Sequence, residues 1–173
     1  ITNAFDTLDF VFYDLKPSDN HEYIQIFGRQ NNERTTKFIR SSYIKNHENL
    51  NKWKIFVPKA NGSGAIGEVL STPLIGKPLI GHTQTYISIE SFNKREEADA
   101  ALKYIKSKFA RSLLSILKIT QDNPAPKWKY VPIQDFTQKS DIDWSKSIPE
   151  IDSQLYSKYE LSQAEIDFIE EKV

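Results

Sequence analysis

Apolar side chains recur at intervals of three and four residues between positions 98 and 116, and this stripe constrains the fold more than any other feature. Such spacing places all its members on one face of an α-helix, which must then pack against another element. Asn93 and Glu96 precede the stripe as a capping box would, and Pro124 follows it. The pattern predicts one long amphipathic helix. Its apolar members are Ala98, Leu102, Ile105, Phe109, Leu113 and Ile116.

Strand patterns lie mainly before this helix. They are short segments rich in β-branched and aromatic residues, and the segment 84–90 alternates polar and apolar side chains. Turn-forming residues at 16–20 separate the first two segments and predict a hairpin between them, whereas residues 31–52 look irregular. The predicted strands are residues 8–13, 23–27, 53–57, 84–90 and 128–131.

Two shorter helices are expected near the C-terminus. Pro149 fits the first turn of one, and Ser162 with Glu165 forms the capping box of the other. These elements predict an α+β (mixed α/β) fold, with a twisted mixed or antiparallel sheet, one long amphipathic helix and short C-terminal helices. We expect a core at residues 1–147 and a helical tail at 148–173, packed on that core or on a neighbouring domain.

Charge is balanced in sum but uneven along the chain. The sequence holds 23 basic and 23 acidic residues, yet positions 29–127 carry 17 bases against 8 acids, and both flanks are acidic. A basic centre between acidic ends is expected where one face meets a polyanion such as DNA. An ordinary solvated surface explains the same distribution equally well.

The absence of certain residue types and segments from the sequence excludes several classes of protein. The absence of cysteine excludes disulfide scaffolds, thiolate metal sites and cysteine nucleophiles. We see neither an apolar run long enough to cross a bilayer nor a secretory leader, so we expect a cytoplasmic protein with no membrane partner. Methionine is also absent, even at position 1, which predicts a fragment of a longer protein or a processed one.

Catalytic motifs are absent or incomplete. Gly62-x-Gly64-x-x-Gly67 has the spacing of a dinucleotide-binding loop, but Pro73 interrupts the helix that this motif requires. The three histidines stand far apart, and Asp141-x-Asp143 lacks the rest of a calcium loop. We therefore expect no catalytic residue, metal or cofactor in this chain. The glycine-rich loop is expected instead to let the backbone approach a partner closely.

Basic, amide and hydroxyl side chains gather around this loop and offer contacts for DNA. Arg, Lys, Asn and Gln read base edges, and Lys with Ser or Thr binds phosphates. Any one of these residues taken singly is better explained as a polar surface residue. Lys59 and Lys77 are expected on phosphates, and Arg34, Lys37 and Arg40 are expected to add backbone contacts or base readout. The predicted central contacts are Lys59, Asn61, Ser63, Lys77, His82 and Gln84.

A series of segments after position 52 carries a resemblance to a known family. They are Trp53-Lys54-Ile55-Phe56-Val57-Pro58-Lys59-Ala60, then residues 103–121, 131–137, 141–145, 151–159 and 161–170. In order and spacing they resemble the C-terminal region of bacterial restriction–modification adenine-specific DNA methyltransferases. That region is similar to the TaqI-like C-terminal specificity domain, the target-recognition domain of such enzymes. The resemblance covers about residues 53–173, and residues 1–52 suit a variable part that reads sequence.

The resemblance implies sequence-specific binding of double-stranded DNA, beside a catalytic methyltransferase domain of the same chain. The family's Asn-Pro-Pro-Tyr motif and S-adenosylmethionine loop would lie upstream, since Asn123-Pro124-Ala125-Pro126 lacks the aromatic residue. This segment is thus expected to bind no cofactor. The parent would use S-adenosylmethionine to methylate adenine N6, and some type II relatives also carry a fused endonuclease. The alternative is a protein-interaction or assembly module of a multi-subunit enzyme.

Overall fold

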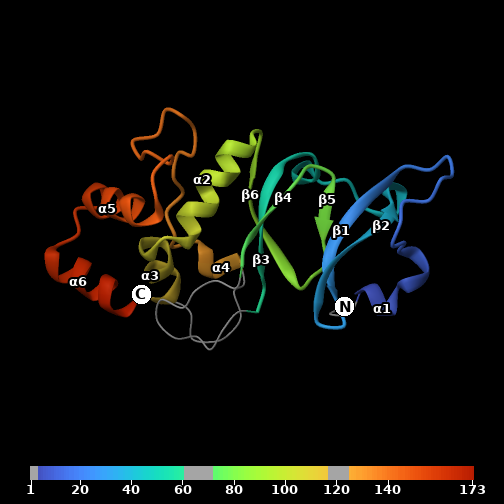
Figure 1. The fold of residues 1–173 in the computed structure, drawn as a ribbon, viewed down its shortest axis with the longest axis horizontal. Helices are drawn as coiled ribbons and strands as arrows, with labels where there is room; N and C mark the ends of the chain where they lie inside the picture. Colours follow the sequence, from blue (N-terminus) through green and yellow to red (C-terminus); the bar gives the residue numbers. More distant parts are fainter. Residues whose placement is uncertain (1–3, 61–71, 117–124) are drawn as a thin grey trace.

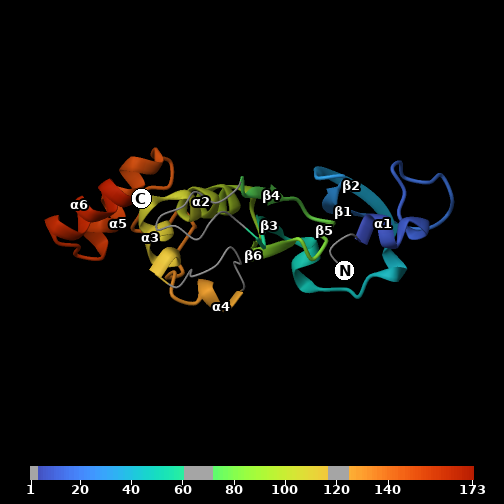
Figure 2. The ribbon, with the colours of Figure 1, turned by 90° about the horizontal axis from the view of Figure 1, so that it is seen from below.

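The computed structural model describes residues 4–60, 72–116 and 125–173 (Figure 1). Two three-stranded sheets and a set of helices make up these ranges, so the predicted α+β class is confirmed. The molecule is elongated, with the strands β1 and β2 toward one end and the helices α5 and α6 at the other (Figures 1 and 2). No helix in the described ranges is long and apolar enough to cross a membrane.

The first sheet is built on a hairpin of β1 (Tyr23–Gln30) and β2 (Glu33–Arg40), with β5 (Ile80–His82) parallel to β1. Asn31 and Asn32 join the two long strands, with φ angles of 50° and 63°. A two-residue hairpin turn needs this left-handed backbone, which asparagine tolerates. Ile24, Ile26 and Ile39 pack with Phe5 of the short helix α1 (Ala4–Thr7) in a small core.

Two predictions in this region are wrong. Residues 9–11 form a 3-10 turn rather than part of a strand, and Tyr13 makes only an isolated bridge to Phe38. The hairpin partner of β1 is therefore β2, within the segment that looked irregular. The sequence did not predict β2 as a strand because only Ile39 of its eight residues is buried, so the apolar side chains that mark a strand are few. Further 3-10 turns follow at Ser41–Tyr43 and Glu48–Asn51.

The second sheet has the order β4-β3-β6 and is antiparallel throughout. It consists of β3 (Trp53–Pro58), β4 (Leu74–Gly76) and β6 (Tyr86–Phe92). The strands predicted at 53–57 and 84–90 are confirmed as β3 and β6. The strand predicted at 128–131 is wrong, because α4 (Ala125–Trp128) and a turn occupy that place.

The predicted long helix is divided into α2 (Arg95–Lys106) and α3 (Lys108–Ile116). Ser107 between them is extended, with ψ of 152°. Its Oγ accepts the backbone N–H of Ala110 at 3.1 Å, and the Asp152 carboxylate accepts those of Lys108 and Phe109 at 3.1 and 2.9 Å. These acceptors satisfy the first N–H groups of a new helix, which makes the break stable.

The last helices are α5 (Ile148–Lys158) and α6 (Gln163–Lys172), and both predicted N-terminal signals are confirmed. Glu165 accepts the backbone N–H of Ser162 at 2.8 Å, which completes the capping box of α6. Ile151 and Leu155 of α5 and Ile169 of α6 join Ile55 of β3 in the main core. This core therefore lies between the second sheet and the helices.

Aromatic rings join the two sheets. The rings of Phe27 in β1 and Phe56 in β3 are stacked, with centroids 5.7 Å apart and planes 8° from parallel. Tyr86 of β6 also contacts Phe27, with ring centroids 4.7 Å apart. A Cβ at Gly76 would lie 2.5 Å from the Phe56 ring, so this position requires glycine. The hairpin is thereby held against the second sheet.

Candidate nucleic-acid interface

The β1–β2 hairpin presents two different faces, because side chains alternate along each strand and paired residues share a face. The face of Ile24, Ile26 and Ile39 packs on α1 and is apolar. The other face is mostly polar, basic and partly or fully exposed. We call it the arginine face; it consists of Tyr23, Gln25, Phe27 and Arg29 of β1 and Arg34, Thr36, Phe38 and Arg40 of β2.

Arg29 and Arg34 stand directly opposite each other beside the hairpin turn, and both are exposed. Arg29 donates to the backbone carbonyl of Asn32 at 2.6 Å, and Arg34 donates to that of Thr72 at 3.1 Å. Among the described residues, Arg29 forms no ion pair. Like charges placed directly across a sheet repel each other. An external anion would relieve this repulsion.

At the far end of the same face, Arg40 belongs to a polar group within the chain. Its guanidinium lies 3.4 Å from the hydroxyl of Tyr23 and 3.5 Å from the carboxylate of Asp19. The backbone N–H of His21 and the Tyr23 hydroxyl both donate to Asp19 and lower the pKa of this carboxyl. Asp19 therefore stays ionised and offsets the charge of Arg40. Arg29, at the turn end of the same face, has no such ion pair among the described residues.

Lys37 does not lie with the two predicted arginines of β2. It occupies the opposite face of the hairpin, where its ammonium is 2.9 Å from the carboxylate of Asp14 and 5.9 Å from the ring centroid of Phe5. Only 13% of its side chain is exposed. The structure thus places Lys37 in an intramolecular ion pair, away from Arg34 and Arg40.

The remaining predicted contacts lie around β5. The backbone N–H of Lys59 donates to Thr85 at 2.9 Å, which brings Lys59 beside Gln84, and both of these side chains are exposed. Lys77, also exposed, precedes β5 and lies at the opposite end of that strand from Gln84. Lys59 and Gln84 therefore do not form one cluster with Lys77. Asn61 and Ser63 fall outside the described residues, as does the Gly62–Gly67 motif.

His82 packs between the sheets rather than projecting as a reader of bases. Its ring meets the Phe56 ring edge-on at 5.2 Å, and its Nδ1 is 2.9 Å from the carbonyl of Thr83. Burial lowers the pKa of His82, so the ring is neutral at physiological pH. The partly buried ring therefore contributes to the sheet junction.

Sequence reasoning missed a buried lysine in β3. Lys54 is 2% exposed, and its ammonium donates to the backbone carbonyls of Asn49, Leu50 and Lys52 at 2.8, 3.1 and 3.1 Å. An ammonium supplies three donors, so all are used here. Burial lowers the pKa of Lys54 to about 8. This side chain ties the turn at Glu48–Asn51 to the second sheet.

Sequence reasoning also missed Arg29 and Gln25, although a signal was present. The alternation that identified the strand at 23–27 continues through Gly28 and Arg29. Among the described residues, no group of three or more acidic or histidine side chains is arranged to hold a metal ion. Comparisons with protein-family models, curated proteins and solved structures found no match to this chain.

Proposed function

We propose that this protein binds double-stranded DNA through the arginine face of the β1–β2 hairpin. The observation that carries the proposal is the exposed pair Arg29 and Arg34 beside the hairpin turn, followed along the ribbon by Gln25 and Thr36. Arginine, glutamine and threonine are side chains that hydrogen-bond to base edges and phosphates. Phe27, which lies between Arg29 and Gln25 on this face, packs against the second sheet, so the part of the face open to DNA is the end beside the turn.

The dimensions of the hairpin suit the major groove. Two paired strands lie about 5 Å apart, and eight residues extend about 27 Å. The major groove of B-DNA is about 12 Å wide and admits a two-stranded β-ribbon. An arginine fork pairs with O6 and N7 of guanine, and a glutamine with N6 and N7 of adenine. Lys59 beside Gln84 would add a phosphate contact from the neighbouring sheet.

We further propose that the domain selects the target site for an adenine-N6 methyltransferase, as the family resemblance implies. An enzyme that modifies a base must take it out of the stack, which needs a separate domain to hold the duplex. The catalytic domain of the same chain would bind S-adenosylmethionine and transfer the methyl group. The hairpin would supply specificity. A fused endonuclease, as in some relatives, would make the parent a type II restriction enzyme.

Replacing Arg29 with glutamine is expected to weaken duplex binding about tenfold and to flatten its salt dependence by about one unit of log K per log salt concentration. The matched control is Arg95→Gln, because Arg95 of α2 is 65% exposed and lies outside the hairpin. Fluorescence anisotropy of a labelled duplex at several salt concentrations measures both quantities. Equal losses in the two variants would refute the hairpin as the binding surface.

A second candidate function, assembly with another protein, is favoured by a groove between α3 and α6. Ile116 and Phe168 border this groove and are 74% and 51% exposed. Exposed apolar side chains of this size mark protein-binding surfaces when they are contiguous. The groove lies far from the hairpin along the molecule (Figure 1). A protein that serves only in assembly would show no effect of Arg29→Gln.

A further inference from the structure

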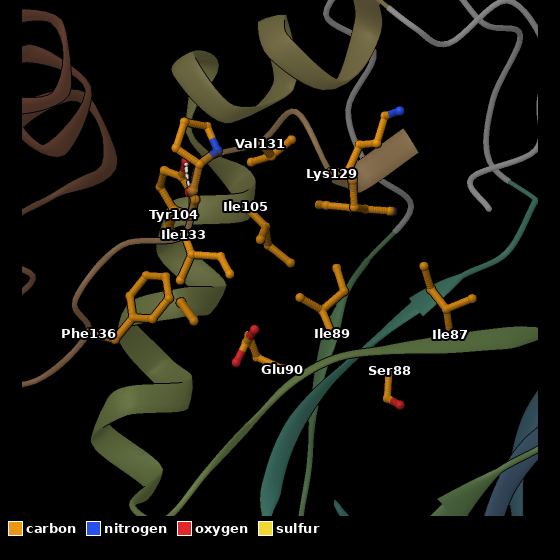
Figure 3. A pocket seen from close by; sticks show the side chains of 13 residues that line it. Ile87, Ser88, Ile89, Glu90, Tyr104, Ile105, Lys129, Val131, Ile133 and Phe136 are labelled. Atoms are coloured by element: carbon orange, nitrogen blue, oxygen red, sulfur yellow. Dashed lines mark hydrogen bonds between the residues drawn. The ribbon is translucent and has the colours of Figure 1, made fainter. Parts of the chain in front are cut away.

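A pocket of about 310 Å³ opens between β6, α2 and the segment that follows α4 (Figure 3). Ile87 and Ile89 of β6 point into it, whereas the side chain of Ser88 points away and its hydroxyl accepts from Asn49 at 3.3 Å. Ser88 nevertheless borders the pocket, so the backbone of β6 faces the space at this residue. The other walls are mainly apolar and include Ala101, Ile105, Val131, Pro132, Ile133 and Phe136.

The strand β6 lies at an edge of the second sheet, since β3 is on one side of it and no described strand is on the other. Its pairing with β3 decides which backbone groups face outward. The N–H of Lys59 donates to Thr85, and hydrogen-bonded pairs alternate from there with pairs that share no hydrogen bond. Ser88, opposite Phe56, falls in a pair of the second kind. The N–H and C=O of Ser88 therefore point away from β3, on the side where the pocket leaves space for a further strand.

Hydrogen bonds hold the wall opposite β6 in place. The buried Gln134 donates to the Tyr159 hydroxyl at 2.7 Å and accepts from Lys158 at 2.9 Å. Lys158 in turn pairs with the Asp141 carboxylate at 2.8 Å. These bonds fix the segment around Gln134 against the helices. The pocket is therefore formed before any ligand arrives.

Charges of opposite sign border the two ends of the pocket. Glu90 lies toward the end bordered by Phe136, and Lys129 lies toward the end of Ile87 (Figure 3). Both charged residues are exposed. An extended segment antiparallel to β6 would begin beside Glu90 and finish beside Lys129. Complementary charge then requires a basic residue near its N-terminus and an acidic residue near its C-terminus.

We propose that β6 and this pocket bind an extended peptide segment of a partner protein, which joins the second sheet as an antiparallel strand. Antiparallel pairing continues the pattern of this sheet. A peptide at a sheet edge gains affinity from main-chain hydrogen bonds and specificity from pockets for alternate side chains. The residue opposite Ser88 would exchange two backbone hydrogen bonds with it. The residues on either side would place apolar side chains against Ile87 and Ile89.

This peptide site is separate from the proposed DNA-binding surface, because α2 and the hairpin lie on opposite sides of β3 (Figures 1 and 2). It is also distinct from the groove between α3 and α6, which shares no residue with it. A failure of peptide binding would therefore leave the proposed binding of DNA untouched.

The probe is the capped peptide Lys-Val-Thr-Val-Glu, whose threonine is placed opposite Ser88. Binding is expected to slow hydrogen exchange of the Ser88 amide, measured by NMR. Replacing the threonine N–H with an ester oxygen is expected to weaken binding about fivefold, because it removes the donor to the Ser88 carbonyl. The same replacement at the first valine is the matched control. Its N–H points away from β6, so affinity is expected to stay within about twofold of the parent peptide.

Two further comparisons test the direction of the peptide and its place. The peptide Glu-Val-Thr-Val-Lys is expected to bind more weakly, because it brings like charges to Glu90 and Lys129. Ile133→Asp at the pocket is expected to weaken binding, whereas Ile116→Asp, at another exposed isoleucine, is not. Equal effects of the two ester replacements, unchanged exchange of the Ser88 amide, or no binding at millimolar peptide would each overturn the proposal.

Discussion

Asp152→Ala is expected to lower the free energy of unfolding by about 3 kcal/mol. Asp152 is 2% exposed, and its two carboxylate oxygens accept the first two backbone N–H groups of α3. Alanine leaves both donors without a partner, and one of them belongs to the buried Phe109. The helix α3 would then lose its N-terminal cap in the middle of the main core. Urea denaturation at neutral pH measures the change.

Asp152→Asn is the matched control for this prediction. It retains one acceptor oxygen and removes the charge, whose burial raises the pKa of the Asp152 carboxyl. We therefore expect a smaller loss, about 1 kcal/mol. Were Asp152→Ala as stable as the wild type, the break between α2 and α3 would not depend on this carboxylate.

The titration of Lys54 by itself is expected to raise the free energy of unfolding of the wild-type chain by about 2–3 kcal/mol between pH 8 and pH 10. Burial lowers the pKa of Lys54 from 10.5 to about 8 in the folded state. Between these two values the unfolded chain binds more protons than the folded chain, so raising the pH favours folding. The buried Tyr104, whose pKa is raised, opposes this trend only near and above pH 10.

Lys54→Met separates this contribution from the other titrating groups. Methionine fills a similar volume but cannot titrate. The free energy of unfolding of the variant is therefore expected not to show the increase between pH 8 and pH 10. Urea denaturation of both proteins at intervals from pH 7 to pH 10 provides the comparison. An identical pH profile for the two proteins would show that Lys54 keeps its ordinary pKa in the folded state.

The helical region shows what local sequence can and cannot predict. Spacing alone predicts the apolar stripe, and Ile105, Phe109 and Ala98 are indeed buried in the main core. Spacing does not reveal the break at Ser107, because the acceptor that stabilises it is Asp152, which lies more than 40 residues away in the chain. Pro149 in the first turn of α5 and the capping box of α6 are local signals, and both were predicted correctly.

The hairpin shows the same limit for the candidate site. Arg34, Lys37 and Arg40 look like one basic group in the sequence, but strands alternate with a period of two, so Lys37 falls on the other face. Which face is exposed depends on the pairing of β2 with β1, and β2 carries too little apolar character to be predicted as a strand. Arg29 becomes a candidate only once this register is known.

The central claim is that the arginine face grips a double helix, and side-chain NMR tests it most directly. The guanidinium Nε–H signals of Arg29 and Arg34 are recorded as duplex DNA is added at moderate salt, with Arg95 as an internal reference. We predict that the signals of Arg29 and Arg34 shift or broaden while that of Arg95 does not. Perturbation confined to the helices, or no perturbation of Arg29 at a saturating concentration of duplex, would contradict it.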